Sequence, residues 1–343
     1  MARNVISYKD GHVYEFAPNM EPLYTAADGE SLTFETIDSL NKAVQSDADL
    51  MDAIPEEVNA ATGPVAVEGA TPGDVLKVEI EDVRVNEDLG RVITAPGFGL
   101  LQDHENIEHP ATRVTEITND GTSLSFKDME IPVDPVIGTI GVATSEEAMS
   151  TLTPHDHGGN LDTTAMTTGT TAYFPVFQDG AMLAMGDSKA AMADGEMCGT
   201  GAEIGTEIDV TVSVIADAAV DLERPLVDTG DVEDDCKCRN DGRCGQDGKR
   251  GPHQITRCRT RLHADRRLPL FEPCWRLEIS QVVDPLVTVR NSIRTNISQI
   301  HSNYRGESVL LVLSRTTISM GTLIWIVDFY SPALVTQTGA EPV

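Results

Sequence analysis

Two short stretches of this chain gather side chains that could do chemistry around glycine residues. Residues 185–203, MGDSKAAMADGEMCGTGAE, contain Asp187, Asp194, Glu196 and Cys198. Residues 154–162, PHDHGGNLD, contain His155, Asp156, His157, Asn160 and Asp162. Oxygen and imidazole ligands at this density suit a divalent cation, which lowers the pKa of a bound water and polarises a carbonyl. Lys189 is the anomaly, because a protonated lysine is no metal ligand.

The sequence pattern predicts that strands position these residues. Apolar and polar residues alternate over five strand-length windows, with turn residues between them. The windows are 31–39, 73–85, 123–133, 171–187 and 205–217. We expect a hairpin-like span over 163–185 to bring the two stretches to one sheet edge. Met51–Ala61 is the one modest helical candidate. No phosphate-binding glycine loop is present, so nucleotide chemistry is not expected.

Composition restricts the class of protein and its partners. The 343 residues are 40% hydrophobic and carry a net charge of −30, which excludes global disorder and disfavours nucleic acid and anionic membranes as partners. The Asp and Glu residues are spread along the chain, which is typical of proteins from extreme halophiles. We prefer this interpretation to an acidic face that binds cations. The N-terminus lacks the apolar core of a secretory signal, and Cys198 is the only cysteine before residue 236, which indicates a cytoplasmic protein.

The chemistry of the chain changes abruptly near residue 235. Residues 1–235 carry 10 Lys+Arg against 46 Asp+Glu, whereas residues 236–276 carry 11 against 4 and five of the six cysteines. A zinc module fits poorly, because the cysteine spacing matches no standard paired pattern, and a basic nucleic-acid arm conflicts with the acidic remainder. A third interpretation is translation in the wrong frame. One constant frame change restores acidity, helical spacing and cysteine usage together, so we hypothesise a compensated frameshift over 233–276 that replaces a helix.

The tail, 297–343, is also atypical. Its apolar run is interrupted by Arg315 and Asp328, leaving twelve uncharged residues over 316–327. About 20 are needed to span a bilayer, so a membrane anchor is not favoured. We expect an added hairpin or translated sequence beyond the natural end.

Several segments resemble the acetamidase/formamidase family in sequence and in order. They are 21–39, 62–83, 93–103, 135–143, 157–164, 172–187, 194–203 and 278–290. The resemblance implies a catalytic domain of residues 1–232 plus 277–296. It also implies a predominantly β, α+β fold, rich in sandwich or barrel structure with few helices, and a homo-oligomer. The frame change over 233–276 restores a run, LSLAGD, that is usual in the family.

The resemblance implies hydrolysis of a short aliphatic amide to a carboxylate and ammonia, with a divalent metal, zinc in the first instance. His157, Asn160 and Asp162 match the family motif HGGN-x-D. Asp187, Asp194 and Glu196 match G-D-x-H…G-D-G-E, and Cys198 matches the following V-C-G-T. Our hypothesis assigns the metal to Asp162, Asp187 and His157. Glu196 would be the base and then the acid, and Asn160 an oxyanion donor. Cys198 is a weaker candidate nucleophile.

Two departures from the family pattern bear on activity. Lys189 stands where the family usually has histidine, and Ala193 replaces a glycine. Lys189 could serve as a base only if burial depresses its pKa, and His155 could replace the lost imidazole. The alternative function is a catalytically silent metal- or ligand-binding homologue. A third possibility is the product of a broken gene.

Overall fold

The computed structural model describes residues 3–55, 57–102, 104–216, 222–229, 275–283, 287–293 and 308–313. These residues belong to one compact unit, Met1–Asp234 with Trp275–Ser314. A second unit, Asp235–Cys274 with Arg315–Val343, lies outside the described residues. The hypothesised frameshift therefore falls outside them too, apart from residues 275–276, as does the tail apart from residues 308–313.

Strands make up the regular structure of the described chain, and the expectation of a predominantly β fold is confirmed. Its one helical turn is a 3₁₀ turn, η1, at Asn119–Gly121, and no described helix is long and apolar enough to cross a membrane. The expected helix at Met51–Ala61 is wrong. Its described residues form bends and irregular chain until β6 begins at Ala61.

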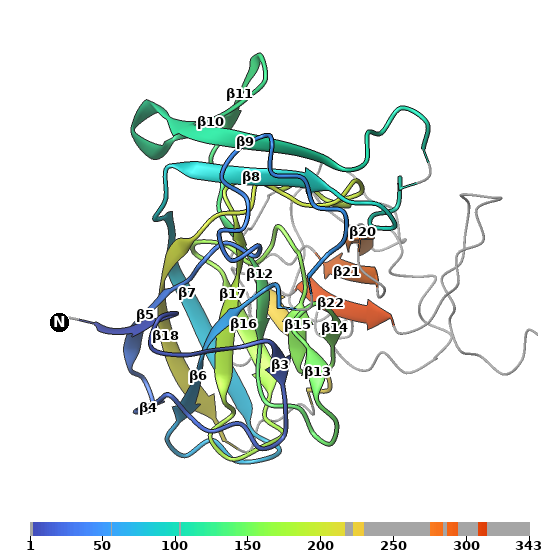
Figure 1. Ribbon diagram of the computed structural model, residues 1–343. Coiled ribbons are helices and arrows are strands. Elements are labelled where there is room, and N and C mark those ends of the chain that lie inside the picture. Colours follow the sequence, from blue (N-terminus) through green and yellow to red (C-terminus); the bar gives the residue numbers. More distant parts are fainter. Residues whose placement is uncertain are drawn as a thin grey trace, which may run out of the picture. The chain divides into compact units, whose positions relative to one another are not determined.

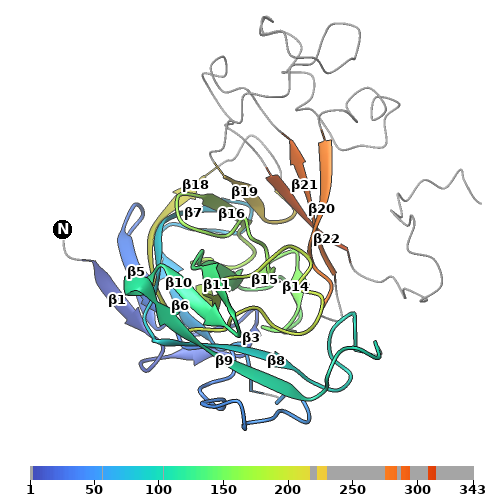
Figure 2. The ribbon, with the colours of Figure 1, turned by 90° about the horizontal axis from the view of Figure 1, so that it is seen from above.

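The larger sheet follows the alternating windows of the sequence. β7 (Val75–Val85) reads VLKVEIEDVRV and is buried at nearly every second position, as expected for a half-buried strand. The described strands of this sheet run, in spatial order, β1 (Asn4–Ser7), β5 (Ser31–Glu35), β18 (Thr206–Ile215), β7, β16 (Thr171–Pro175), β19 (Leu226–Asp228), β22 (Ser308–Leu313), β21 (Val287–Ile293) and β20 (Trp275–Gln281). Figure 2 shows β20, β21 and β22 side by side, beyond β19.

The second sheet holds both polar stretches. Its spatial order is β14 (Pro154–His155), β15 (Gly158–Asn160), β12 (Val136–Gly141), β17 (Leu183–Lys189), β6 (Ala61–Val67) and β2 (His12–Val13), with β4 (Tyr24–Ala26) also on β6. The expected hairpin over 163–185 is wrong, because β16 and β17 lie in different sheets. The stretches meet because β15 and β17 pair with opposite edges of β12.

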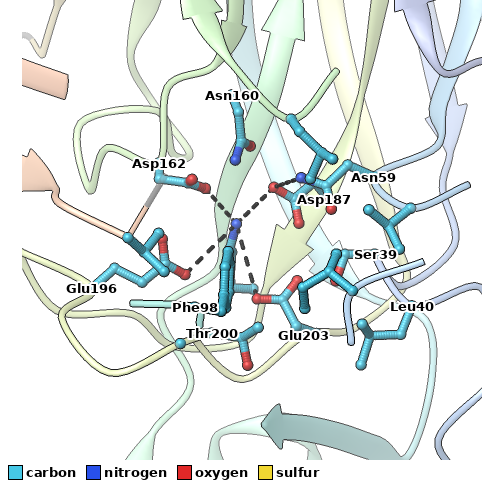
Figure 3. A pocket seen from close by; sticks show the side chains of 16 residues that line it. Ser39, Leu40, Asn59, Phe98, Asn160, Asp162, Asp187, Glu196, Thr200 and Glu203 are labelled. Atoms are coloured by element: carbon cyan, nitrogen blue, oxygen red, sulfur yellow. Dashed lines mark hydrogen bonds and ion pairs between the residues drawn. The ribbon is translucent and has the colours of Figure 1, made fainter. Parts of the chain in front are cut away.

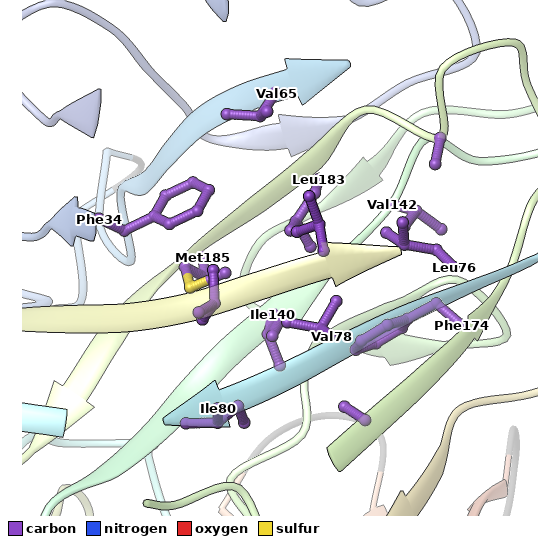
Figure 4. Packing of buried hydrophobic residues seen from close by; sticks show 14 of the residues in the cluster. Phe34, Val65, Leu76, Val78, Ile80, Ile140, Val142, Phe174, Leu183 and Met185 are labelled. Carbon is purple, nitrogen blue, oxygen red and sulfur yellow. The ribbon is translucent and has the colours of Figure 1, made fainter. Parts of the chain in front are cut away.

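The two large sheets share an apolar core. Phe34, Val78 and Phe174 of the larger sheet pack with Ile140 and Leu183 of the second, and all five are essentially inaccessible to solvent (Figure 4). Aliphatic side chains supply most of this core, as the low aromatic content requires. The arrangement is a β-sandwich.

Two smaller sheets complete the described fold. A four-stranded antiparallel sheet consists of β8 (Leu89–Thr94), β9 (Ala111–Thr118), β10 (Ser123–Phe126) and β11 (Met129–Pro132), and lies across the top of the view in Figure 1. β3 (Glu15–Phe16) pairs with β13 (Met149–Ser150). Single backbone bridges join Glu203 to both Arg91 of β8 and Lys189 of β17, so the four-stranded sheet is tied to the strand that carries the acidic residues.

Candidate active site

A small cavity opens where β15 and β17 meet the loops that follow them. Its volume is about 30 Å³, enough for a ligand of a few heavy atoms. Polar side chains from several segments far apart in the sequence converge on it (Figure 3). The lining residues include Asn59, Phe98, Asn160, Asp162, Asp187, Lys189, Glu196, Thr200, Glu203 and Val283.

Lys189 lies at the centre of four carboxyl groups. Its Nζ is 2.8 Å from Oδ2 of Asp187 and donates a short hydrogen bond to Oδ1 of Asp162. The same Nζ is 3.9 Å from Oε1 of both Glu196 and Glu203. All five side chains are at most 4% exposed, so this charged cluster is removed from bulk water.

The backbone is held in a rarely populated conformation at three of the four acidic residues. The φ angles are 41° at Asp162, 51° at Asp187 and 35° at Glu196, and Asn59 on the cavity wall has φ 55°. Non-glycine residues at such angles cost of order 1–3 kcal/mol each and concentrate at functional sites. Their clustering around one cavity makes it the candidate site of the described fold.

Glycines make room for the lysine. A Cβ at Gly138 of β12 would lie within 2.5 Å of Oδ2 and of the backbone oxygen of Asp187, and would clash with Nζ of Lys189. A Cβ at Gly201 would lie 2.7 Å from Cγ of Lys189. The two positions thus shape a slot for the lysine stem and its ammonium group.

Amide and hydroxyl groups orient the carboxylate of Asp187. Nδ2 of Asn59 donates to its Oδ2 at 3.1 Å, and Oγ1 of Thr139 lies 3.4 Å from the same oxygen. Oγ1 of Thr139 also donates to Oδ1 of Asn160 at 2.7 Å, which turns the Asn160 amide nitrogen to the other side. Sequence reasoning missed Asn59 and Thr139, because no motif connects them with the acidic loop.

Glu203 is a further residue that sequence reasoning missed, although it ends the 185–203 stretch. Its backbone exchanges hydrogen bonds with Arg91: the Arg91 N–H donates to the Glu203 carbonyl at 2.9 Å, and the Glu203 N–H donates back at 2.8 Å. Arg91 is itself buried, donating to the Val44 carbonyl at 2.8 Å and to Oε2 of Glu87 at 2.8 Å. The one feature of the sequence that could have indicated Glu203 is its position between two glycines, shortly before β18.

The loop that carries Glu196 is anchored from a distant part of the chain. The N–H of Gly195 donates to the Ser280 carbonyl at 2.9 Å, and the N–H of Val282 donates to the Gly195 carbonyl at 3.1 Å. Val283 then contributes to the cavity wall. Residues 280–283, part of a segment with family resemblance, therefore complete the cavity wall.

Burial shifts the proton affinities of the cluster. It raises the pKa of Asp162 to about 6 and that of Asp187 to about 8, against the opposing attraction of Lys189. Burial also raises the pKa of Glu203, and raises that of Glu196 well above its usual value. Burial alone would lower the pKa of Lys189, but attraction to Asp162 and the other carboxylates outweighs it and keeps that pKa well above its usual value. Lys189 is therefore a cation, not the neutral base considered from the sequence.

Asp162 and Glu196 each have one buried carboxyl oxygen that no donor of another described residue reaches, Oδ2 of Asp162 and Oε2 of Glu196. Against the effect of burial, the Lys189 ammonium and the Glu196 carboxyl both lower the pKa of Asp162. Oε1 of Glu196 accepts a hydrogen bond from the Gly201 N–H at 2.9 Å, which fixes the carboxyl in place. Burial thus favours a protonated Glu196, whereas attraction to Lys189 favours an ionised Asp162.

Four residues expected in the site lie away from the cavity wall. The His157 ring is buried 4.8 Å from the Phe16 ring, and its pKa is lowered to about 3 by burial and by His155. His155 lies 6.0 Å from His157, ring to ring. Asp194 is exposed and accepts from Oγ1 of Thr164 at 2.9 Å, and Cys198 is a half-buried free thiol. Asn160, Asp162, Asp187, Lys189 and Glu196 are brought together.

The expected divalent metal does not fit these side chains. A divalent ion would need the carboxylate oxygens at about 2.0–2.6 Å, but the Lys189 ammonium already occupies their centre. At 4 Å, a divalent ion and the ammonium would repel by about 8 kcal/mol at an effective dielectric constant of 20. Within the described ranges, no group of three or more His, Cys, Asp or Glu residues could hold a metal ion.

Comparisons with known proteins identify the family to which this chain belongs. The model of the acetamidase/formamidase family matches residues 3–151 and 144–241, so the chain belongs to that family. A formamidase of Methylophilus methylotrophus is 26% identical over 266 residues, which cover 61% of this chain and 65% of the relative. The chain thus spans just under two thirds of that relative's length.

Solved structures agree with this assignment. A predicted acetamidase/formamidase from Thermoanaerobacter tengcongensis is 33% identical with a TM-score of 0.70, covering 84% of this chain and 94% of that one. An acetamidase from Bacillus halodurans is 31% identical with a TM-score of 0.70, covering 84% and 96%. The family resemblance drawn from the sequence is confirmed.

Proposed function

We propose that this chain hydrolyses a short aliphatic amide to a carboxylate and ammonia. The observation that carries the proposal is the buried Asp162–Glu196 carboxyl pair on the wall of a cavity of about 30 Å³. A cavity of this size favours formamide and acetamide over longer amides. The names of the related formamidase and acetamidases support the same class of substrate.

The residues of the cavity suit the two proton transfers that amide hydrolysis needs. The Asp162 carboxylate takes a proton from water as the water oxygen attacks the carbonyl carbon. The Asn160 amide and the Lys189 ammonium stabilise the oxyanion that forms. Glu196 then gives its proton to the amide nitrogen, the C–N bond breaks, and ammonia leaves. In this scheme Glu196 is the general acid only, and Asp162 takes the role of general base that the sequence-based hypothesis gave to Glu196.

Ammonia release from an amide series tests the proposal. Formamide, acetamide, propionamide and butyramide are offered to the full-length protein in high salt, and rates are expected to fall as the acyl chain lengthens. Glu196→Gln keeps an oxygen for the Gly201 N–H but has no acidic proton, so its rate should fall by about 10²–10⁴. Asp194→Asn, altered at an exposed residue of the same loop, is the control and should keep the rate within a few-fold. Equal rates for Glu196→Gln and the unaltered protein would contradict the assignment.

One observation favours a catalytically silent ligand-binding protein as the second candidate. Lys189 pairs with Asp162, the proposed base, and so reduces its affinity for a further proton. On that alternative, a folded protein binds amides in equilibrium dialysis but releases no ammonia from any of them.

A homo-oligomeric assembly and a cytoplasmic location stay predictions, testable by light scattering and cell fractionation.

A further inference from the structure

We infer that the Lys189 ammonium is the resident cation of this site and that the four carboxyl groups hold it in place of a divalent metal ion. The inference goes beyond the proposed function, because it concerns the charge balance of the cavity whether or not an amide is cleaved there.

The first support is the position of Nζ. Asp162 follows β15, whereas Asp187, Glu196 and Glu203 lie on β17 and in the loop after it, and all four direct carboxylate oxygens at this one atom (Figure 3). The two aspartates contact it directly, and the two glutamates lie at 3.9 Å. A surface lysine that had turned inward would find one such partner. Here the ammonium lies at the centre of four acidic side chains whose negative charge would otherwise have no cation beside it.

The second support is the space provided for the lysine. β12 and the loop before β18 have glycine at the two positions, 138 and 201, where a Cβ would displace the ammonium or the stem. The Lys189 side chain is 3% exposed, although its residue type is almost never fully buried unless it is paired. The fold is therefore shaped around a lysine here, from both sides.

The third support is the absence of a competing metal site in the part of the chain that the structure describes. His157 is buried against Phe16, and His155 lies beyond it, so neither imidazole joins the carboxylates. The oxygens that could bind a divalent ion are the ones that Lys189 holds. Lysine and metal thus compete for one position.

The test counts metal in the full-length protein. The protein is incubated with ZnCl₂, desalted and analysed by mass spectrometry of zinc, and its Tm is measured with and without EDTA. With the cysteines alkylated beforehand, we expect less than about 0.1 zinc per chain and no change of Tm, because the described residues offer no vacant ligand set. Lys189→His replaces the ammonium by a metal-binding imidazole and should take up about one zinc per chain, with a Tm that falls when EDTA is added.

Lys127→His is the matched control, since Lys127 is exposed on the turn between β10 and β11 and should give no zinc uptake. Zinc at one per chain in the unaltered protein, or a fall of its Tm with EDTA, would overturn the inference. A folded Lys189→His protein that stays free of zinc would overturn it too. If that variant does not fold, the two measurements on the unaltered protein decide. The zinc count is independent of ammonia release, so failure of the amidase proposal would be seen separately.

Discussion

Asp187 and Lys189 lie two residues apart on β17, and Nζ of Lys189 is 2.8 Å from Oδ2 of Asp187. Alternate residues of a strand share a face, so the strand itself places the cation beside its first counter-ion. The other three carboxylates are brought to this pair by tertiary structure. β17 is buried along its whole length, which makes a charged pair within it a feature that only function or a complete set of partners sustains.

Replacing the ammonium should destabilise the fold in a pH-dependent way. Lys189→Met leaves buried carboxylates without a cation, and we expect the free energy of unfolding to fall by about 3–5 kcal/mol at pH 8. The loss should be smaller at pH 5, below the pKa values of about 6 for Asp162 and about 8 for Asp187, because both groups are then protonated. Urea denaturation at the two pH values measures this. A loss that is the same at both would contradict the charge-balance argument.

The slot for the lysine should not tolerate a methyl group at Gly138. In Gly138→Ala the Cβ meets the Asp187 backbone oxygen at 2.5 Å, and we expect a destabilisation of about 1–3 kcal/mol with loss of ammonia release. Gly11→Ala is the matched control, because its Cβ would meet only the half-exposed Leu23 side chain, at 3.1 Å, which is able to move. Thermal denaturation distinguishes them: equal Tm values for the two variants would show that no slot exists.

His157 should make the protein sensitive to acid. Burial lowers its pKa to about 3 in the folded state. Between pH 6.5 and 3, His157 therefore binds a proton in the unfolded chain but not in the folded chain. Its contribution to stability is therefore present above pH 6.5 and lost as the pH falls toward 3, by about 1.4 kcal/mol per pH unit. His157→Gln should flatten the fall in unfolding free energy between pH 6.5 and 5 relative to the unaltered protein. Parallel curves would refute the assignment.

Amide hydrolysis should show a bell-shaped pH profile. The rising limb follows ionisation of Asp162, with a pKa of about 6, because only its carboxylate accepts a proton from water. The falling limb follows ionisation of Asp187, with a pKa of about 8, which adds negative charge beside the developing oxyanion. Measurement of kcat/KM from pH 5 to 9 tests this, and Asp187→Asn should lose the upper limb. A profile flat across pH 5–9 would exclude both assignments.

The anchor of the Glu196 loop should matter for catalysis more than for folding. Val282→Pro removes the N–H that donates to the Gly195 carbonyl at 3.1 Å, and kcat/KM is expected to fall by at least about ten-fold as Glu196 loses its position. Val282→Ala retains that N–H and serves as the control. Steady-state kinetics with circular dichroism separates the two effects. An active Val282→Pro protein would show that the bridge is dispensable.

The sequence allowed the strands to be predicted because apolar residues alternate in them, and each of the five windows contains strands. Met51, Ile54 and Val58 have helix-like spacing, but Ile54 and Val58 line the cavity instead of a helix face. Their spacing reflects contacts with the site, which periodicity does not distinguish from a helix.

The sequence predicted those residues of the candidate site that lie in local motifs. Asn160, Asp162, Asp187, Lys189 and Glu196 lie in two glycine-rich motifs and were identified by residue type. Asn59 and Glu203 reach the cavity only through the pairing of distant strands, which local spacing does not encode. His157 was misplaced because it lies one residue before a glycine pair with φ 108° and 91°, which redirects the chain and leaves the ring against Phe16.

The backbone bridge between Gly195 and residues 280–282 has a consequence for how the protein is made. The acidic loop cannot reach its final form until a partner some 85 positions later in the chain has left the ribosome. Pairings of such high sequence separation form late, after local strands have already assembled. A nascent chain that ends before residue 280 therefore lacks the backbone partners of Gly195, and the loop that carries Glu196 is not yet held in place. The position of Glu196 is thus set late in synthesis, by residues far from it in the sequence.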